Sequence, residues 1–176
     1  MRILRGKTAA LVIDYQEKLV PVMHEKERLI QNSCILLAGL EALGIPMAVT
    51  QQYTKGLGMT VEEITEACKE IEYAEKITFS AFNHIEYDIK GKKYIIVCGI
   101  EAHICVLQTV LDLIEEGYIP VVVEDCISSR KPNDKKIALK RMRDAGAIIT
   151  TYESVLFELL QQAGTAEAKV IQRLIK

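Results

Sequence analysis

The feature that most constrains the fold is a set of short apolar runs, rich in β-branched residues, that do not alternate with polar residues. A strand that is apolar at every position is buried on both faces, as in a parallel sheet covered by helices. Segments with helical periodicity separate the runs, so strands and helices alternate along the chain. This pattern predicts an α/β fold, with strands over Ala9–Ile13, Pro46–Thr50, Tyr94–Val97, Ile119–Val123 and Ala147–Thr150.

The segments between the runs predict the helices. In the first and longest, Leu29, Leu36 and Leu40 recur on one stripe, and Gly44 follows at the position where glycine commonly ends a helix. No internal repeat or low-complexity linker interrupts the pattern, so we expect one domain over residues 1–176. Helices are predicted over His24–Leu43, Thr60–Ile71, Ile104–Glu116, Asp134–Asp144, Ser154–Gln162 and Thr165–Ile175.

Composition and charge exclude several classes of protein. Lys and Arg total 22 against 24 Asp and Glu, so no net positive field is available to hold a nucleic acid. No uncharged apolar run approaches the roughly 20 residues of a membrane span, and charges interrupt the first seven residues before a signal-like stretch forms. We therefore expect a cytoplasmic protein with no nucleic-acid or membrane partner. The dispersed, odd-numbered cysteines predict neither disulfides nor a zinc site: Cys34, Cys68, Cys98, Cys105 and Cys126.

Reactive side chains follow several of the predicted strands. In a doubly wound sheet, ligand sites lie at the carboxyl ends of the strands, where the winding reverses. Asp14 comes directly after the first strand, Asp125 follows the Ile119 strand, and Cys105 lies beyond Gly99 in the first turn of the predicted Ile104–Glu116 helix. There the helix dipole would favour a thiolate.

Each of these residues also has a structural interpretation. An aspartate after a strand is often a cap or turn former, and we interpret Asp125 in that way. A thiol in an apolar helix is usually a packing group. Lys76, which precedes the aromatic stretch around Phe79 and Phe82, could be a surface lysine whose stem covers apolar atoms. Near Asp14 and Cys105, its ammonium would instead stabilise a thiolate and an oxyanion.

Taken together, these segments resemble the isochorismatase-like cysteine hydrolase superfamily, and in particular its small isochorismatase-domain proteins. The similar stretches occur in the family's order and span most of the chain. The resemblance implies a three-layer α/β/α sandwich around a mostly parallel, doubly wound sheet. The stretches that carry it are Leu11–Gln16, Val49–Gly58, Glu75–Phe82, Val97–Val106 and Val123–Arg130.

The resemblance also implies roles for individual residues. Asp14 would be the acid/base, Lys76 its electrostatic partner and Cys105 the nucleophile. A cis peptide bond is implied at Ile100–Glu101, and the N–H groups of Glu101 and Cys105 would form the oxyanion hole. Residues implied to line the substrate pocket are Gln16, Leu19, Tyr53, Phe79 and His103.

The implied activity is hydrolysis of a C–N bond in a small amide, ureide or carbamoyl compound through an acyl-enzyme. Nicotinamidases of the superfamily carry an Asp-x-His…His metal site after the second strand, but this chain has Gln51–Gly56 there, which disfavours that activity. We therefore expect no metal and no cofactor. Isochorismatases proper lack the nucleophilic cysteine and act on a vinyl ether. A non-catalytic module that binds a small molecule in the same pocket is the alternative.

The predicted Ile104–Glu116 helix is apolar around most of its circumference, with only a narrow polar stripe of Gln108, Asp112 and Glu115. A second apolar cluster falls at Val155–Leu160. Internal packing would explain both. Large apolar surfaces on a monomer also mark interfaces, and on that basis we predict a homo-oligomer.

Overall fold

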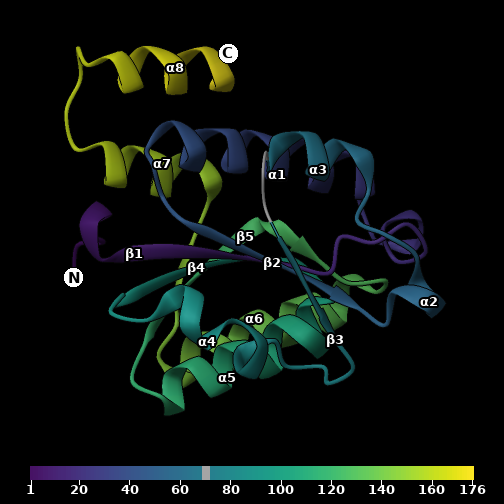
Figure 1. Cartoon of the computed structure of the whole chain (residues 1–176). Coiled ribbons are helices and arrows are strands. Elements are labelled where there is room, and N and C mark those ends of the chain that lie inside the picture. The colour runs from purple at the N-terminus through teal and green to yellow at the C-terminus, as the bar shows by residue number, and fades with distance from the viewer. Residues whose placement is uncertain (69–71) are drawn as a thin grey trace.

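A twisted parallel sheet forms the centre of the computed structural model, which describes residues 1–68 and 72–176 but not the side chains of residues 86–88 (Figure 1). The described strands are ordered β3-β2-β1-β4-β5-β6, and every neighbouring pair is parallel. The predicted α/β class with a doubly wound sheet is confirmed. The strands are β1 (Thr8–Ile13), β2 (Met47–Gln52), β3 (Tyr73–Lys76), β4 (Tyr94–Ile100), β5 (Ile119–Ser128) and β6 (Ile148–Thr150).

Helices cover both faces of the sheet, which gives three layers (Figure 1). Alternate residues of β1 serve the two cores, because Ala10 and Val12 pack with α1, whereas Leu11 and Ile13 pack with α5. The helices on the first face are α1 (Lys26–Ala42), α3 (Glu62–Ala67), α7 (Tyr152–Leu160) and α8 (Ala166–Ile175). Those on the other face are α4 (Phe82–Ile89), α5 (Leu107–Glu115) and α6 (Pro132–Ala145).

The winding of the sheet reverses at β1. From β1 the chain runs outward to β2 and β3 and then returns to β4, which pairs with the free side of β1. Ile13 lies opposite Gly99 at the end of this pair. The strands approach so closely there that a Cβ on Gly99 would lie 2.2 Å from the carbonyl oxygen of Ile13. A glycine at this position therefore lets the carboxyl ends of β1 and β4 meet.

The region between β2 and β4 differs most from the prediction. It contains an additional strand, β3, and the helix α4, while the predicted helix over residues 60–71 is helical only at Glu62–Ala67 and its last residues, 69–71, lie outside the described part. The strand β3 has the sequence Tyr-Ala-Glu-Lys and forms the edge of the sheet. An edge strand needs little apolar surface, so it carries no apolar run for sequence patterning to detect.

Two further element boundaries differ. The regular helix α5 begins at Leu107, and a π-helical turn over Ala102–Val106 precedes it (η3), so the expectation that Cys105 lies in the first turn of an α-helix was wrong. The strand β5 continues to Ser128, beyond the predicted end at Val123, because it pairs with β4 again at Ile127 after a bulge. Polar residues in the bulge interrupt the apolar run that patterning detects.

No helix within residues 1–68 and 72–176 combines the length and the apolar character that crossing a lipid bilayer requires.

The short remaining elements are the helix α2 (Thr54–Leu57) and the 3₁₀ turns η1 (Arg5–Lys7) and η2 (Val20–Val22).

Candidate active site

Asp14 is held in a buried position immediately after β1. Its backbone has φ +53°, a left-handed conformation that aspartate tolerates better than most residues. Its side chain has no solvent exposure, Thr50 Oγ1 donates to Oδ1 at 2.8 Å, and Lys76 Nζ lies 2.6 Å from Oδ2. Oδ2 nevertheless has no hydrogen-bond donor in good geometry among the described residues, which leaves it able to accept another proton.

Lys76, the last residue of β3, is fully buried rather than a surface lysine. Its Nζ donates to Gln52 Oε1 at 2.6 Å and to the carbonyl oxygens of Phe79 and Thr78 at 3.0 and 3.3 Å. With the Asp14 carboxylate, these oxygens surround the ammonium. A buried charge is tolerated when it is paired and hydrogen-bonded in this way.

A pair of glutamines supports the ion pair. Gln52 Nε2 donates to the carbonyl oxygen of Ile77, which orients its own Oε1 toward Lys76. Gln16 Nε2 donates to the carbonyl oxygens of Gln52 and Gly58, and Gln16 Oε1 accepts from the N–H of Gln52. The Gln16 side chain is thus fully buried and bonded to backbone, so it holds the end of β2 rather than offering a polar group to the pocket.

Cys105 lies in the π-helical turn after β4 and is 6% exposed. Burial raises the pKa of this thiol to about 12, and the negative charge of Asp14 acts in the same direction, whereas Lys76 lowers it. The fold therefore brings all three side chains together, with a neutral thiol beside an ionised pair.

The turn that carries Cys105 begins at Glu101. The Ile100–Glu101 peptide bond is cis. The carbonyl oxygen of Glu101 accepts from the N–H groups of Ile104 at 3.0 Å and Val106 at 3.3 Å, which closes the turn. The N–H groups of Glu101 and Cys105 belong to this compact segment.

The residues implied to line the pocket lie in different environments. Tyr53 and Phe79 are about half exposed, at 49% and 54%, beyond the ends of β2 and β3. Leu19 is partly buried against the core on the α1 face. His103 Nδ1 lies 2.9 Å from Ser129 Oγ, and its Nε2 lies 3.8 Å from a carboxylate oxygen of Asp134.

Sequence reasoning missed three residues around the site, namely Thr50, Gln52 and Arg130. Thr50 and Gln52 lie in β2 and contact the ion pair, and Arg130 follows β5 and contacts Glu101. The last residues of a strand at a winding reversal are a usable signal for the first two. Local sequence carries no signal for the contact between Arg130 and Glu101.

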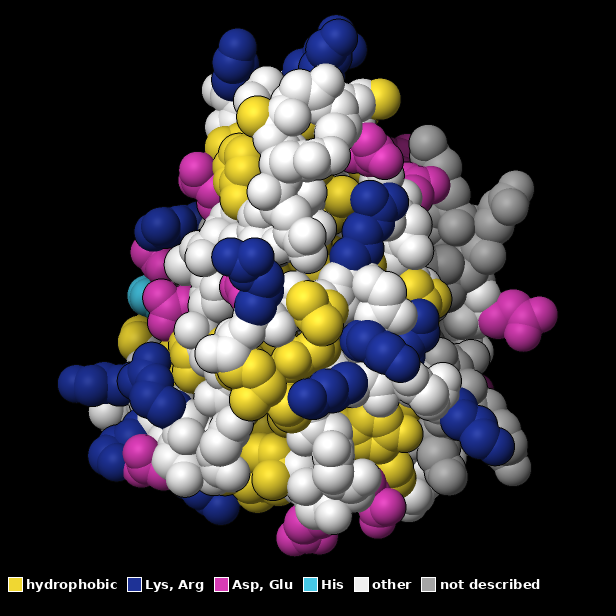
Figure 2. Space-filling view, turned by 90° about the vertical axis from the view of Figure 1, so that its left-hand side faces the viewer, with side chains coloured by type: hydrophobic (Ala, Val, Ile, Leu, Met, Phe, Trp, Pro, Cys, Tyr) yellow, Lys and Arg dark blue, Asp and Glu magenta, His cyan; other side chains and the backbone are white. Residues whose placement is uncertain are grey.

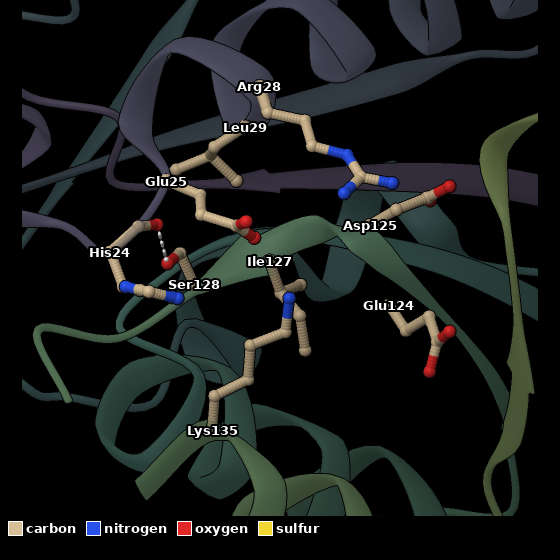
Figure 3. A pocket seen from close by; sticks show the side chains of 9 residues that line it. All are labelled: His24, Glu25, Arg28, Leu29, Glu124, Asp125, Ile127, Ser128 and Lys135. Carbon is tan, nitrogen blue, oxygen red and sulfur yellow. Dashed lines mark hydrogen bonds between the residues drawn. The ribbon is translucent and has the colours of Figure 1, made fainter. Parts of the chain in front are cut away.

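A separate cavity of about 320 Å³ lies between the start of α1, the second half of β5 and Lys135 of α6 (Figure 3). None of the three reactive side chains lines it. Burial lowers the pKa of Lys135 and raises the pKa of Asp125. Asp125 Oδ1 accepts the N–H of Tyr152 at 2.9 Å, at the start of α7, which supports its interpretation as a structural residue.

The buried thiols make stability sensitive to alkaline pH. Burial raises the pKa of Cys68, Cys98 and Cys105 to about 12 each, against about 8.5 in an unfolded chain. Above the pKa of the unfolded chain's thiols, the unfolded chain loses protons that the folded chain keeps. We expect the free energy of unfolding, measured in urea, to fall by about 4 kcal/mol per pH unit between about pH 9 and 11 from these thiols. Cys98→Ala should lower the slope by about 1.4 kcal/mol per pH unit, and an unchanged slope would contradict the assignment.

Comparison with known proteins gives consistent results. A solved structure described as MAR1 ribonuclease from Caenorhabditis elegans is 38% identical, covers 99% of this chain and 92% of that one, and superposes with a TM-score of 0.95. The secreted isochorismatase effector Isc1 of Phytophthora sojae is 35% identical over 99% of this chain and 87% of its own length. The Escherichia coli YcaC product, described as an octameric hydrolase of unknown specificity, shares the fold at 24% identity, with a TM-score of 0.92 over 99% of this chain and 90% of that one.

The family described as Isochorismatase domain matches residues 8–154, which include β1 to β6 and every residue of the site described above. On this match, and on its similarity to the Phytophthora relative, the chain belongs to the isochorismatase family and has its hydrolase fold.

Proposed function

We propose that this protein hydrolyses a C–N bond of a small amide, ureide or carbamoyl compound, with Cys105 as nucleophile, Asp14 as acid/base and Lys76 as electrostatic partner. The observation that carries the proposal is the buried Asp14–Lys76 ion pair next to a neutral thiol. Taking two charges and a thiol out of water costs free energy, and packing alone does not require them. A nucleophile beside its base is the arrangement that covalent catalysis needs.

The proposed reaction starts with the proton on sulfur. Asp14 Oδ2 takes the thiol proton as Cys105 Sγ attacks the substrate carbonyl, and the N–H groups of Glu101 and Cys105 donate to the resulting oxyanion. As the C–N bond breaks, Asp14 returns the proton to the departing nitrogen, which leaves a thioester. Asp14 then deprotonates a water molecule that attacks the thioester, and the proton returns to Sγ as the acid is released.

Lys76 has two tasks in this scheme. Its charge favours the thiolate that forms during attack, and its contacts to Gln52, Thr78 and Phe79 hold it at the Asp14 carboxylate. Because those contacts exist before substrate binds, no reorganisation is needed when charge moves from Asp14 to sulfur.

The proposal needs neither metal nor cofactor. The chain lacks the Asp-x-His motif after β2 that nicotinamidases use, and has Gln51, Gln52 and Tyr53 there. Within the described part of the chain, no three His, Cys, Asp or Glu side chains converge as metal ligands would. Three ligands close together are the minimum for a catalytic zinc site.

We further propose that the protein is a cytoplasmic homo-oligomer. The Val155–Leu160 cluster does not support this, because most of it is buried in the chain's own core and only Phe157 is exposed. Apolar side chains do gather on the face that carries the N-terminus (Figure 2), where Met1 and Leu4 are exposed. Exposed apolar clusters mark interfaces, and the related YcaC fold is described as octameric. A 19.8 kDa species in light scattering would contradict this.

The role of Asp14 is tested by its effect on Cys105 labelling. We expect iodoacetamide at pH 7 to alkylate Cys105 faster than the half-buried Cys34, and Asp14→Asn to slow Cys105 by about 100-fold, because the base is lost. If Asp14 were only a charge, its removal would lower the pKa of Cys105 and speed the reaction, since Lys76 would then act alone. Peptide mass mapping measures both rates.

The matched control for this experiment is Asp125→Asn, which changes an aspartate in β5 that does not line the site. Cys105 should then react at the parental rate. Equal or faster labelling of Asp14→Asn would eliminate Asp14 as the base.

A further inference from the structure

Arg130, the second residue after β5, is fixed by the carboxylate of Glu101. Its backbone N–H donates to Oε2 at 3.0 Å, and its Nε lies 3.1 Å from both carboxylate oxygens. The Glu101 side chain is 7% exposed, whereas the Arg130 side chain is 59% exposed. The pair thus has a buried carboxylate that orients a guanidinium at the surface.

The pairing leaves the far end of the guanidinium available. The hydrogen bonds between Arg130 and Glu101 use Nε and the backbone N–H, and the two Nη atoms donate no hydrogen bond to the described part of the chain. Two parallel N–H donors are the geometry that binds a carboxylate with two hydrogen bonds.

The guanidinium is held beside the turn that carries the nucleophile. Ile100 pairs with Ser128, so the residues after Ser128 run alongside the start of the Ala102–Val106 turn. Ser129 Oγ contacts His103 Nδ1 at 2.9 Å, which ties the two segments together a second time. Arg130 therefore lies against the same short segment as Cys105.

We propose that Arg130 binds an anionic group, in the first place a carboxylate, on the substrate that Cys105 attacks, and that Glu101 is the positioning residue for Arg130. This inference rests on the function proposed above. The charges at the reacting centre cancel, because Asp14 and Lys76 form a closed ion pair, so the centre itself does not repel an anion. The guanidinium then selects amides that carry a carboxylate over neutral ones.

Two reagents of similar size and different charge test the proposal. Iodoacetate and iodoacetamide alkylate the same sulfur with the same leaving group, but only iodoacetate has a carboxylate. We measure the rate of Cys105 alkylation by iodoacetate divided by the rate by iodoacetamide, using peptide mass mapping. In Arg130→Met this ratio should fall by about tenfold, which corresponds to the loss of one charge-assisted hydrogen bond. Lys131→Met, which removes the neighbouring exposed charge, should leave the ratio within about twofold of the parent.

A parental ratio in Arg130→Met would overturn the proposal. If Cys105 reacts with neither reagent faster than Cys34 in the parent, the proposed function fails and the inference falls with it, so the two failures are distinguishable. If Arg130→Met does not fold, the proposal is tested on the parent protein alone, by measuring how well a small amide protects Cys105 from alkylation by iodoacetamide. Succinamate, which has an amide and a carboxylate, should protect at lower concentration than neutral succinamide, and equal protection would overturn the proposal.

Discussion

Cys105→Ala should lower the hydrolysis of any small amide, ureide or carbamoyl compound that the parent protein turns over by at least about 1,000-fold, because no other group can form the thioester. The fold should be unaffected, because alanine fits where the thiol was. The substitution removes only a group that is buried in its neutral form, as its raised pKa indicates. Release of ammonia or amine from a panel of such compounds measures turnover. The thermal unfolding midpoint reports whether the variant is intact.

The control is Cys34→Ala, which removes a half-buried thiol of α1 on the other face of the sheet. Its turnover should equal the parent's. An RNA oligonucleotide belongs in the panel because the related Caenorhabditis elegans structure is described as a ribonuclease. Turnover that survives Cys105→Ala would refute a nucleophilic role, and a parent that turns over nothing in the panel would favour the non-catalytic binding module.

Lys76→Met should destabilise the protein by about 3 to 5 kcal/mol at pH 7, because it leaves the Asp14 carboxylate buried without its counterion. Urea unfolding measures the loss. The double variant Asp14→Asn with Lys76→Met should recover part of the stability, because both charges are gone.

The control for Lys76→Met is Lys140→Met, which breaks an exposed ion pair with Asp144 on α6. Such pairs contribute less than about 1 kcal/mol. Equal effects of Lys76→Met and Lys140→Met would mean that the Asp14–Lys76 pair is solvated in solution, and the site described above would be wrong.

The sheet was largely predictable from the sequence, and the reason is burial. The strands β1 and β4 are buried at every position, so β4, and β1 from Ala9 onward, form unbroken apolar runs. The edge strand β3 was missed because one side of it faces no other strand and its sequence is largely polar. The π-helical turn before α5 was also missed, because its residues have the same apolar pattern as the helix that follows.

The reactive residues were identified through resemblance to a family, and pattern alone would have left each with a structural interpretation. Nothing local distinguishes Lys76 from a surface lysine. Its burial follows from the position of β3 next to β2, which places Gln52 opposite Lys76. Likewise, Gln16 was expected in the pocket but is bonded to backbone, since the loop at Gly58 folds over it.

Local sequence patterns encode the alternation of strands and helices, the parallel sheet and the edge at which a site would lie, because periodicity and burial act over a few neighbouring residues. Which polar groups meet at that edge depends on the folded chain. The contacts of Asp14 with Lys76 and of Glu101 with Arg130 join different strands and loops, and such contacts depend on strand order and register. Those are properties of the folded sheet as a whole, and no short segment encodes them.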